Sequence, residues 1–322
     1  MLKLQALSSL TLKDVPSDTP FVAYRLPGQV DFNVCLQPRF DGTRLCCPEI
    51  EICTWLAQPF ASMPVAKTST PRSKYGAAIN GIVSGLRERG GKTVICRQIC
   101  GCFDRFAPLA MAEEYFAAFP GMFCFLFYHP STGYWMGASP ELLLEVDSNG
   151  TGHTRALAGT RKAGEAGQWS DKNIEEHRIV VDDICSRVAA AGAGYKAIAG
   201  ETGDMCYGHI EHLATPVDIC SPEGVDMRRI VDAIHPTAAV GGYPLHRALP
   251  EIAAAEDAPR YFYGGTMITN TLAYVVLRCV HFDAERWCVY TGSGITASSD
   301  AADEWNETEA KAAPLIDILG KY

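Results

Sequence analysis

The chain has 322 residues, enough for one large domain or two ordinary ones, and it is 48% apolar and 20% charged. This composition excludes a disordered chain, a collagen-like repeat and a coiled-coil rod. The net charge of −9 argues against nucleic acid or an anionic membrane surface as a partner. Residues 122–128, the longest uninterrupted apolar stretch, are too few to cross a bilayer. Residues 1–10 lack the apolar core of a secretory signal, so we expect a cytoplasmic protein.

Thirteen cysteines are many for such a protein, but none of them form the paired C-x₂-C spacing of a zinc knuckle. Cys124, Cys279 and Cys288 lie inside apolar runs, where a free cysteine behaves as a small buried hydrophobe. We therefore expect reduced thiols rather than disulfides or a zinc site.

Hydrophobic periodicity predicts mostly paired strands between amphipathic helices. In chain order, the predicted elements are strands 21–26 and 32–36, helix 74–89, strand 93–102, helix 107–119, strands 122–128 and 142–146, helices 173–191, 225–233 and 245–256, strands 274–282 and 287–290, and helix 300–319. Residues 272–282 and 287–295 read as a hairpin around the turn 283–286. Consecutive strands favour antiparallel pairing and an α+β fold. We expect a single domain over residues 1–322. Its N-terminal portion, residues 1–69, is β-rich, and the polar loop 67–73 separates this portion from the rest of the chain.

Two acidic clusters are candidates for chemistry. Glu304, Glu307 and Lys311 share one stripe of the last predicted helix, a pattern that also fits a solvated helix face. Glu176 lies at the edge of the apolar face of helix 173–191, although an acidic helix start would explain it equally well. Carboxylates from two distant helices meeting over a cavity would suit Mg²⁺.

Two further side chains border apolar strands. Glu141 directly precedes a strand, where burial would raise its pKa and suit it for general acid catalysis; alternatively it ends the strand in water. Lys92 opens another strand and either reaches the surface or lies in a pocket. From the residues alone, the surface position is the better interpretation for Lys92.

The order of several motifs resembles that of chorismate-utilising enzymes, which include isochorismate, salicylate, anthranilate and aminodeoxychorismate synthases. The motifs are Ser139-Pro140-Glu141-Leu142, Ala156 to Arg161, Glu176-His177, His235-Pro236-Thr237 with Gly241-Gly242, Arg260-x-x-Tyr263-x-Gly265, Leu277-Arg278, Gly292-Ser293-Gly294 and Glu304-Trp305-x-Glu307-x₃-Lys311. The resemblance covers residues 70–320, about four-fifths of the chain. It implies the chorismate-binding fold, a large α/β sandwich of two packed antiparallel sheets with outer helices.

The resemblance also implies roles for individual residues. Glu176 and Glu307 match the carboxylates that hold Mg²⁺, and Glu304 would lie just behind them. Tyr263 and Arg278 match residues that grip the pyruvyl carboxylate of chorismate. The other implied substrate-binding residues are Gly159, Thr160, His235, Gly292, Gly294 and Lys311. Asn173 departs from the pattern, because several relatives carry an acid at this position.

Two positions indicate which member of the family the chain resembles. Members that use water carry a lysine base at the position of Lys92, and aminodeoxychorismate synthases typically have a nucleophilic lysine where this chain has Ala158. We therefore expect Mg²⁺-dependent addition of water at C2, with Glu141 protonating the departing C4 hydroxyl to give isochorismate. Lys92 must be partly neutral for this role, through desolvation or a neighbouring cation such as Arg97.

An isochorismate synthase of this kind would need no glutaminase subunit and would feed menaquinone or siderophore biosynthesis. Two alternatives stay open. One is a salicylate synthase, which would go on to eliminate pyruvate from isochorismate. The other is a non-catalytic binding subunit.

Overall fold

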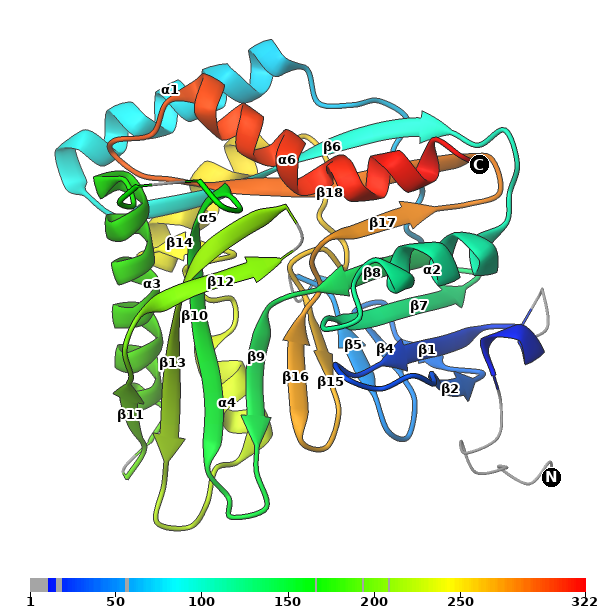
Figure 1. Ribbon diagram of the computed structural model, residues 1–322, viewed down its shortest axis with the longest axis horizontal. Coiled ribbons are helices and arrows are strands. Elements are labelled where there is room, and N and C mark those ends of the chain that lie inside the picture. Colours follow the sequence, from blue (N-terminus) through cyan, green and yellow to red (C-terminus); the bar gives the residue numbers. More distant parts are fainter. Residues whose placement is uncertain (1–10, 16–18, 56–57, 166, 193, 208) are drawn as a thin grey trace.

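The computed structural model describes residues 11–15, 19–55, 58–165, 167–192, 194–207 and 209–322. In these residues two antiparallel β-sheets are flanked by helices, which confirms the α+β prediction (Figure 1). Residues 1–10, on which the expectation about a secretory signal rests, lie outside the described residues. No helix in the described part of the chain is long and apolar enough to span a membrane.

The first sheet has eight strands, and its longest pair is β6 with β18. In spatial order its strands are β14 (Gly242–Tyr243), β6 (Lys92–Cys102), β18 (Arg286–Ile295), β17 (Cys279–Phe282), β8 (Gly133–Ser139), β7 (Phe123–His129), β1 (Phe21–Arg25) and β2 (Asn33–Leu36).

The second sheet has its longest pair in β10 and β13. In spatial order its strands are β11 (Lys196–Ala199), β13 (Ile210–Cys220), β10 (Gly152–Lys162), β9 (Leu142–Val146), β16 (Leu272–Val275), β15 (Thr266–Ile268), β5 (Glu51–Cys53), β4 (Arg44–Cys46) and β3 (Arg39–Phe40), while β12 (Gly203–Tyr207) also pairs with β13. Residues 21–53 thus supply strands to both sheets. The single domain stays a prediction.

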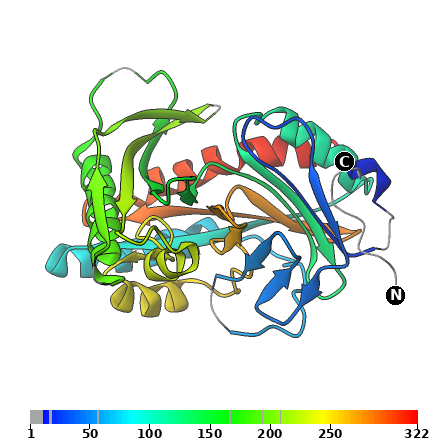
Figure 2. The ribbon, with the colours of Figure 1, turned by 90° about the horizontal axis from the view of Figure 1, so that it is seen from below.

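Six α-helices of the described chain agree with the six that periodicity predicts, each within a few residues at its ends. They are α1 (Arg72–Arg89), α2 (Pro108–Ala117), α3 (Asp171–Ala190), α4 (Met227–Ile234), α5 (Leu245–Ala255) and α6 (Ala301–Leu319), and a short 3₁₀ helix spans Leu12–Asp14. Helix α3 packs on β10, β11 and β13 at one end of the molecule, and the C-terminus lies at the other end (Figures 1 and 2). Helix α6 runs along β18, so its first turns meet those of α3.

Strand β7 shows why the buried strands read as continuous apolar runs. Successive side chains of a strand point to opposite faces. Phe123, Phe125 and Phe127 pack in the aromatic cluster that contains residues of both sheets. Cys124 and Leu126 face the cluster formed with α2 and α6. Because both faces are covered, no polar residue interrupts the run. Cys124, Cys279 and Cys288 are buried as predicted.

The predicted strand 274–282 is wrong in one respect, because the chain leaves one sheet and enters the other within it. Residues up to Val275 belong to β16 and pair with β9 and β15, whereas Cys279–Phe282 form β17 and pair with β8 and β18. Arg278, at the break, has a positive φ of 49°. The hairpin prediction is therefore correct only for β17 and β18.

The sequence prediction missed β10 and β13, which form the wall of the second sheet nearest α3. Strand β13 contains Pro216, and a proline normally argues against an internal strand. Here β12 pairs with β13 up to Ala214 and β11 pairs with it from Val217, so Pro216 falls in the gap between these two neighbours. Both strands carry residues of the candidate site.

Candidate active site

A cavity lies where the two sheets meet the second turn of α3 and the middle of α6. Ten of the residues predicted from the sequence line it: Lys92, Glu141, Gly159, Thr160, Glu176, Tyr263, Arg278, Gly292, Gly294 and Lys311. Its other lining residues are Val94, Pro140, Leu157, Ala158, His212, Ala239, Val240, Arg260, Leu277, Tyr290, Thr291 and Ser293. Glu304 and Glu307 line an adjoining polar cavity, which shares Thr160 with the first.

Lys92 enters the cavity from the first sheet, and Glu141 enters it from the connection between the two sheets. Lys92 is the first residue of β6; its side chain is buried, not at the surface, and its Nζ lies 2.9 Å from Glu176 Oε1. Glu141 lies between β8 and β9, and burial raises its pKa to about 7, although Lys92 and a hydrogen bond from Thr237 oppose the shift. At neutral pH a substantial fraction of Glu141 therefore carries a proton.

Arg97 does not lie beside Lys92, so it is not the neighbouring cation that was one of the two alternatives expected from the sequence. The two residues are five apart in β6 and so point to opposite faces of the sheet. The Arg97 guanidinium stacks 3.7 Å from the centre of the Trp305 ring and hydrogen-bonds Thr308 Oγ1 and Glu309. Arg97 instead joins β6 to α6.

Three carboxylates from α3 and α6 surround the ammonium group of Lys172. Lys172 Nζ lies 2.9 Å from Glu176 Oε2, 3.0 Å from Glu304 Oε1 and 3.9 Å from Glu307 Oε2. Burial opposes ionisation of Glu176, but Lys172 and Lys92 outweigh it and lower its pKa. Sequence analysis missed Lys172, although its i,i+4 spacing from Glu176 was a usable signal.

The carboxylates match the donor set of a hard divalent cation. Mg²⁺ takes carboxylate oxygens and retains several water ligands. Glu304 Oε2 is buried and has no hydrogen-bond partner among the described residues. Burial raises the pKa of Glu304 to about 7, and the charges of Glu307 and Glu176 add to this shift. The described residues hold no group of three or more His, Cys, Asp or Glu side chains already arranged around one ion position, and the Lys172 ammonium lies among these three carboxylates. Charge and donor type nevertheless fit a cation.

Glycines let the carboxylates approach the first sheet closely. A Cβ on Gly294 would clash with Glu176 Oε1 and with Lys92 Cε. Gly159 has a positive φ of 72°, and a Cβ there would press on Asn173 at 3.2 Å. The ion pair of Lys92 with Glu176 therefore depends on a bare backbone at Gly294.

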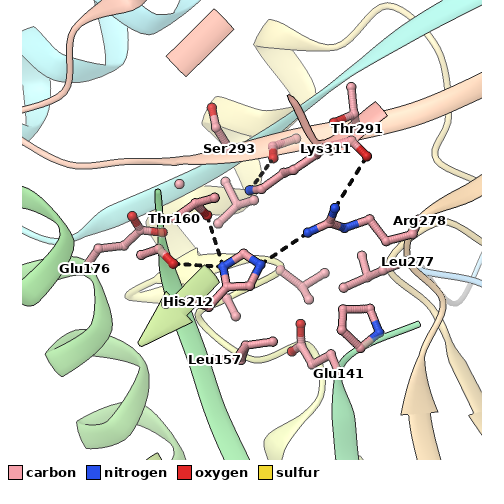
Figure 3. A pocket seen from close by; sticks show the side chains of 18 of the residues that line it. Glu141, Leu157, Thr160, Glu176, His212, Leu277, Arg278, Thr291, Ser293 and Lys311 are labelled. Carbon is pink, nitrogen blue, oxygen red and sulfur yellow. Dashed lines mark hydrogen bonds between the residues drawn. The ribbon is translucent and has the colours of Figure 1, made fainter. Parts of the chain in front are cut away.

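Arg278 lies across the cavity from Glu176, as Figure 3 shows, and Lys311 brings a second positive charge from α6, where its Nζ also hydrogen-bonds Glu307. Arg278 Nη2 lies 3.2 Å from His212 Nε2, and His212 Nδ1 lies 2.8 Å from the Gly159 carbonyl oxygen. Burial and the charge of Arg278 lower the pKa of His212 to about 3, so the ring is neutral. Its Nδ1–H donates to Gly159, and its Nε2 accepts from Arg278. Sequence analysis missed His212 because it missed β13.

His235 does not line the cavity, which corrects the prediction. It follows the last residue of α4, and its buried ring meets the Trp55 ring edge-on. Thr237, two residues later, reaches the site instead and donates to Glu141 Oε1 at 3.4 Å. The motif thus contributes its threonine, while its histidine packs in the core.

A model of the family described as chorismate binding enzyme matches residues 57–317, well over half of the chain. The chain belongs to the chorismate binding enzyme family. It is 28% identical over 286 residues to the salicylate biosynthesis isochorismate synthase of Pseudomonas aeruginosa, a match covering 81% of this chain and 58% of that protein. It is 29% identical over 215 residues to isochorismate synthase MenF of Haemophilus influenzae, covering 62% of this chain and 49% of that protein.

The solved structure of MenF, the menaquinone-specific isochorismate synthase from Escherichia coli, matches with a TM-score of 0.76 at 20% identity, over 96% of this chain and 92% of that chain. This likeness shows the fold. The chain spans about half the length of the curated relatives it matches.

Proposed function

We propose that this protein is an isochorismate synthase, which converts chorismate to isochorismate by adding water at C2 and expelling the C4 hydroxyl. The observation that carries the proposal is that Lys92 and a partly protonated Glu141 are both buried and line one cavity. The similar proteins named isochorismate synthases support it. Ala158 also lines the cavity, so no lysine there offers covalent attack on the ring.

The positive side of the cavity suits a dianionic substrate. Arg278, held by neutral His212, presents a planar fork that matches the pyruvyl carboxylate. Lys311, whose Nζ donates to the Gly292 carbonyl oxygen at 3.0 Å, would face the ring carboxylate. Mg²⁺ held by Glu176 and Glu307 would supply a second positive charge at that carboxylate. Binding of both carboxylates fixes the ring between the base and the acid.

Proton transfer then falls to two side chains. In its neutral form, Lys92 Nζ takes a proton from the attacking water as the oxygen bonds to C2. Glu141 gives its proton to the C4 hydroxyl, which leaves as water. One water enters and one leaves, so the reaction is a balanced isomerisation. Substrate and product are isomers with the same kinds of bonds, so their free energies differ little. The reaction should therefore stop at a mixture of the two.

The proposal is tested by incubating the purified protein with chorismate and Mg²⁺ and separating the products by chromatography. We expect a plateau with both isomers, no requirement for glutamine, and conversion of added isochorismate back to chorismate. Lys92→Ala should lower turnover by a factor of about 10²–10⁴. Stoichiometric pyruvate with salicylate would identify a salicylate synthase instead, and no turnover of chorismate by wild type would contradict the proposal.

A further inference from the structure

The ammonium group of Lys172 forms ion pairs with all three carboxylates of the proposed metal site. Its side chain is 15% exposed and lies against Glu176, Glu304 and Glu307. The carboxylates' other partners differ from one another. Lys92 lies on Glu176 and Lys311 on Glu307, while the Ser299 hydroxyl donates to Glu304 at 2.6 Å. Among the described residues, only Lys172 bridges α3 to both acids of α6.

The carboxylates form a wall between two cavities, and Lys172 approaches them from the far side. Glu176 lines the substrate cavity, whereas Glu304, Glu307 and Lys172 line the adjoining polar cavity of about 600 Å³. Lys172 is absent from the described lining of the substrate cavity. Its four-carbon side chain therefore has room to withdraw without disturbing the substrate side.

An ammonium and a divalent cation cannot both occupy these oxygens. Mg²⁺ binds carboxylate oxygens at about 2.0–2.1 Å. Lys172 Nζ already lies 2.9 Å from Glu176 Oε2 and faces Glu307 Oε2 at 3.9 Å. A cation bound to both Glu176 and Glu307 would lie close to the Lys172 ammonium group. The two positive charges would repel each other strongly, because the site is largely buried.

We propose that Lys172 is a built-in competitor for the divalent cation. Its ammonium holds the first turns of α3 and α6 together in the metal-free protein, and it moves into the polar cavity when a divalent cation binds Glu176 and Glu307. The inference rests on the metal site of the proposed function, but not on the reaction itself.

Calorimetric titration of the full chain with MgCl₂, without chorismate, tests the competition. Lys172→Met removes the charge and keeps the length, so its Kd for Mg²⁺ should fall at least tenfold below that of wild type. Its Tm in EDTA should be lower than that of wild type and should rise more on addition of Mg²⁺. Lys162→Met is the matched control, because Lys162 lines the same cavity without a described contact to the three carboxylates, and its Kd should be unchanged. An unchanged or weaker affinity in Lys172→Met would overturn the proposal.

A second test uses the wild-type protein, so its result does not depend on whether a variant folds. Lysines are acetylated with an amine-reactive ester and located by mass spectrometry, in EDTA and in saturating MgCl₂. Lys172 should react faster with Mg²⁺ present, whereas Lys162 should react equally in both. Equal or slower labelling of Lys172 would refute the displacement. If neither wild type nor Lys172→Met bound Mg²⁺, the metal site of the proposed function would fall as well; equal binding in both proteins would remove only the competition.

Discussion

Glu141 links the burial of one carboxyl group to the pH dependence of the proposed reaction. Burial raises its pKa to about 7, so the acid form needed for C4 departure is lost above neutrality. We therefore expect the infrared carbonyl band of the Glu141 carboxylic acid, identified by its absence in Glu141→Gln, to weaken about tenfold for each pH unit well above pH 7. Glu141→Gln should be inactive in both directions, because the group that protonates in one direction deprotonates in the other. A carboxylic-acid band of unchanged strength from pH 5 to pH 9 in wild type would contradict the role of Glu141.

The same pKa has a consequence for stability. The folded protein binds a proton on Glu141 that the unfolded chain releases near pH 4.5, so stability is lost as pH rises from about 4.5 to about 7 and is level above that. The loss should reach about 3 kcal/mol, from roughly 1.4 kcal/mol for each pKa unit. The glutamine in Glu141→Gln does not titrate. The free energy of unfolding of this variant, measured with denaturant, should therefore rise relative to that of wild type between about pH 4.5 and pH 7. A stability difference that does not vary with pH would refute the shift.

At the scale of the elements, Gly294 fixes how closely β18 approaches α3. A methyl group there would clash with Glu176 Oε1 and Lys92 Cε. Gly294→Ala should destabilise the fold by about 1–3 kcal/mol through overpacking and should reduce turnover at least a hundredfold. Gly81→Ala is the control: its Cβ meets no described atom within 4 Å, and alanine favours the helix by about 0.5–1 kcal/mol. Wild-type activity in Gly294→Ala would contradict this geometry.

Arg97 connects β6 with α6 through its stack on Trp305 and its hydrogen bond to Thr308, donated by Nε at 2.7 Å. Arg97→Leu loses both interactions in a buried position, so the free energy of unfolding should drop by about 2 kcal/mol. Arg178→Leu breaks only an exposed ion pair with Asp182 on α3 and should change stability little. Equal effects in the two variants, measured by denaturant unfolding, would show that Arg97 does not join these elements.

Local patterns predicted the helices and the most apolar strands, because these elements bury a regular apolar face, but they missed many of the shorter or more polar strands. The run 122–128 became β7, and all six helices were anticipated with their boundaries nearly correct. The exceptions depend on the rest of the chain. Nothing local shows that the chain changes sheets at Arg278, and Pro216 in β13 is tolerated only because its two neighbouring strands end beside it.

At the scale of the whole molecule, the site is built from segments that are far apart in the sequence. Ordered motifs, through their resemblance to a family, brought Lys92, Glu141 and Glu176 together as candidates, and the structure places them in one cavity. The same reasoning missed His212 and Lys172, whose importance comes from long-range partners: Arg278 for the first, the acids of α6 for the second. Residue patterns do not report such partners, because pairing across sheets and helices is set by the tertiary fold.

Labelling with ¹⁸O distinguishes the addition of water to chorismate by Lys92 and Glu141 from transfer of the hydroxyl within the substrate. The protein is incubated with chorismate and Mg²⁺ in H₂¹⁸O, and the isochorismate formed is analysed by mass spectrometry. We expect one ¹⁸O atom in each isochorismate molecule, at the C2 hydroxyl, and gradual labelling of the remaining chorismate through the reverse reaction. Isochorismate formed without ¹⁸O would show that the hydroxyl moves within the substrate, and it would contradict water addition by this pair.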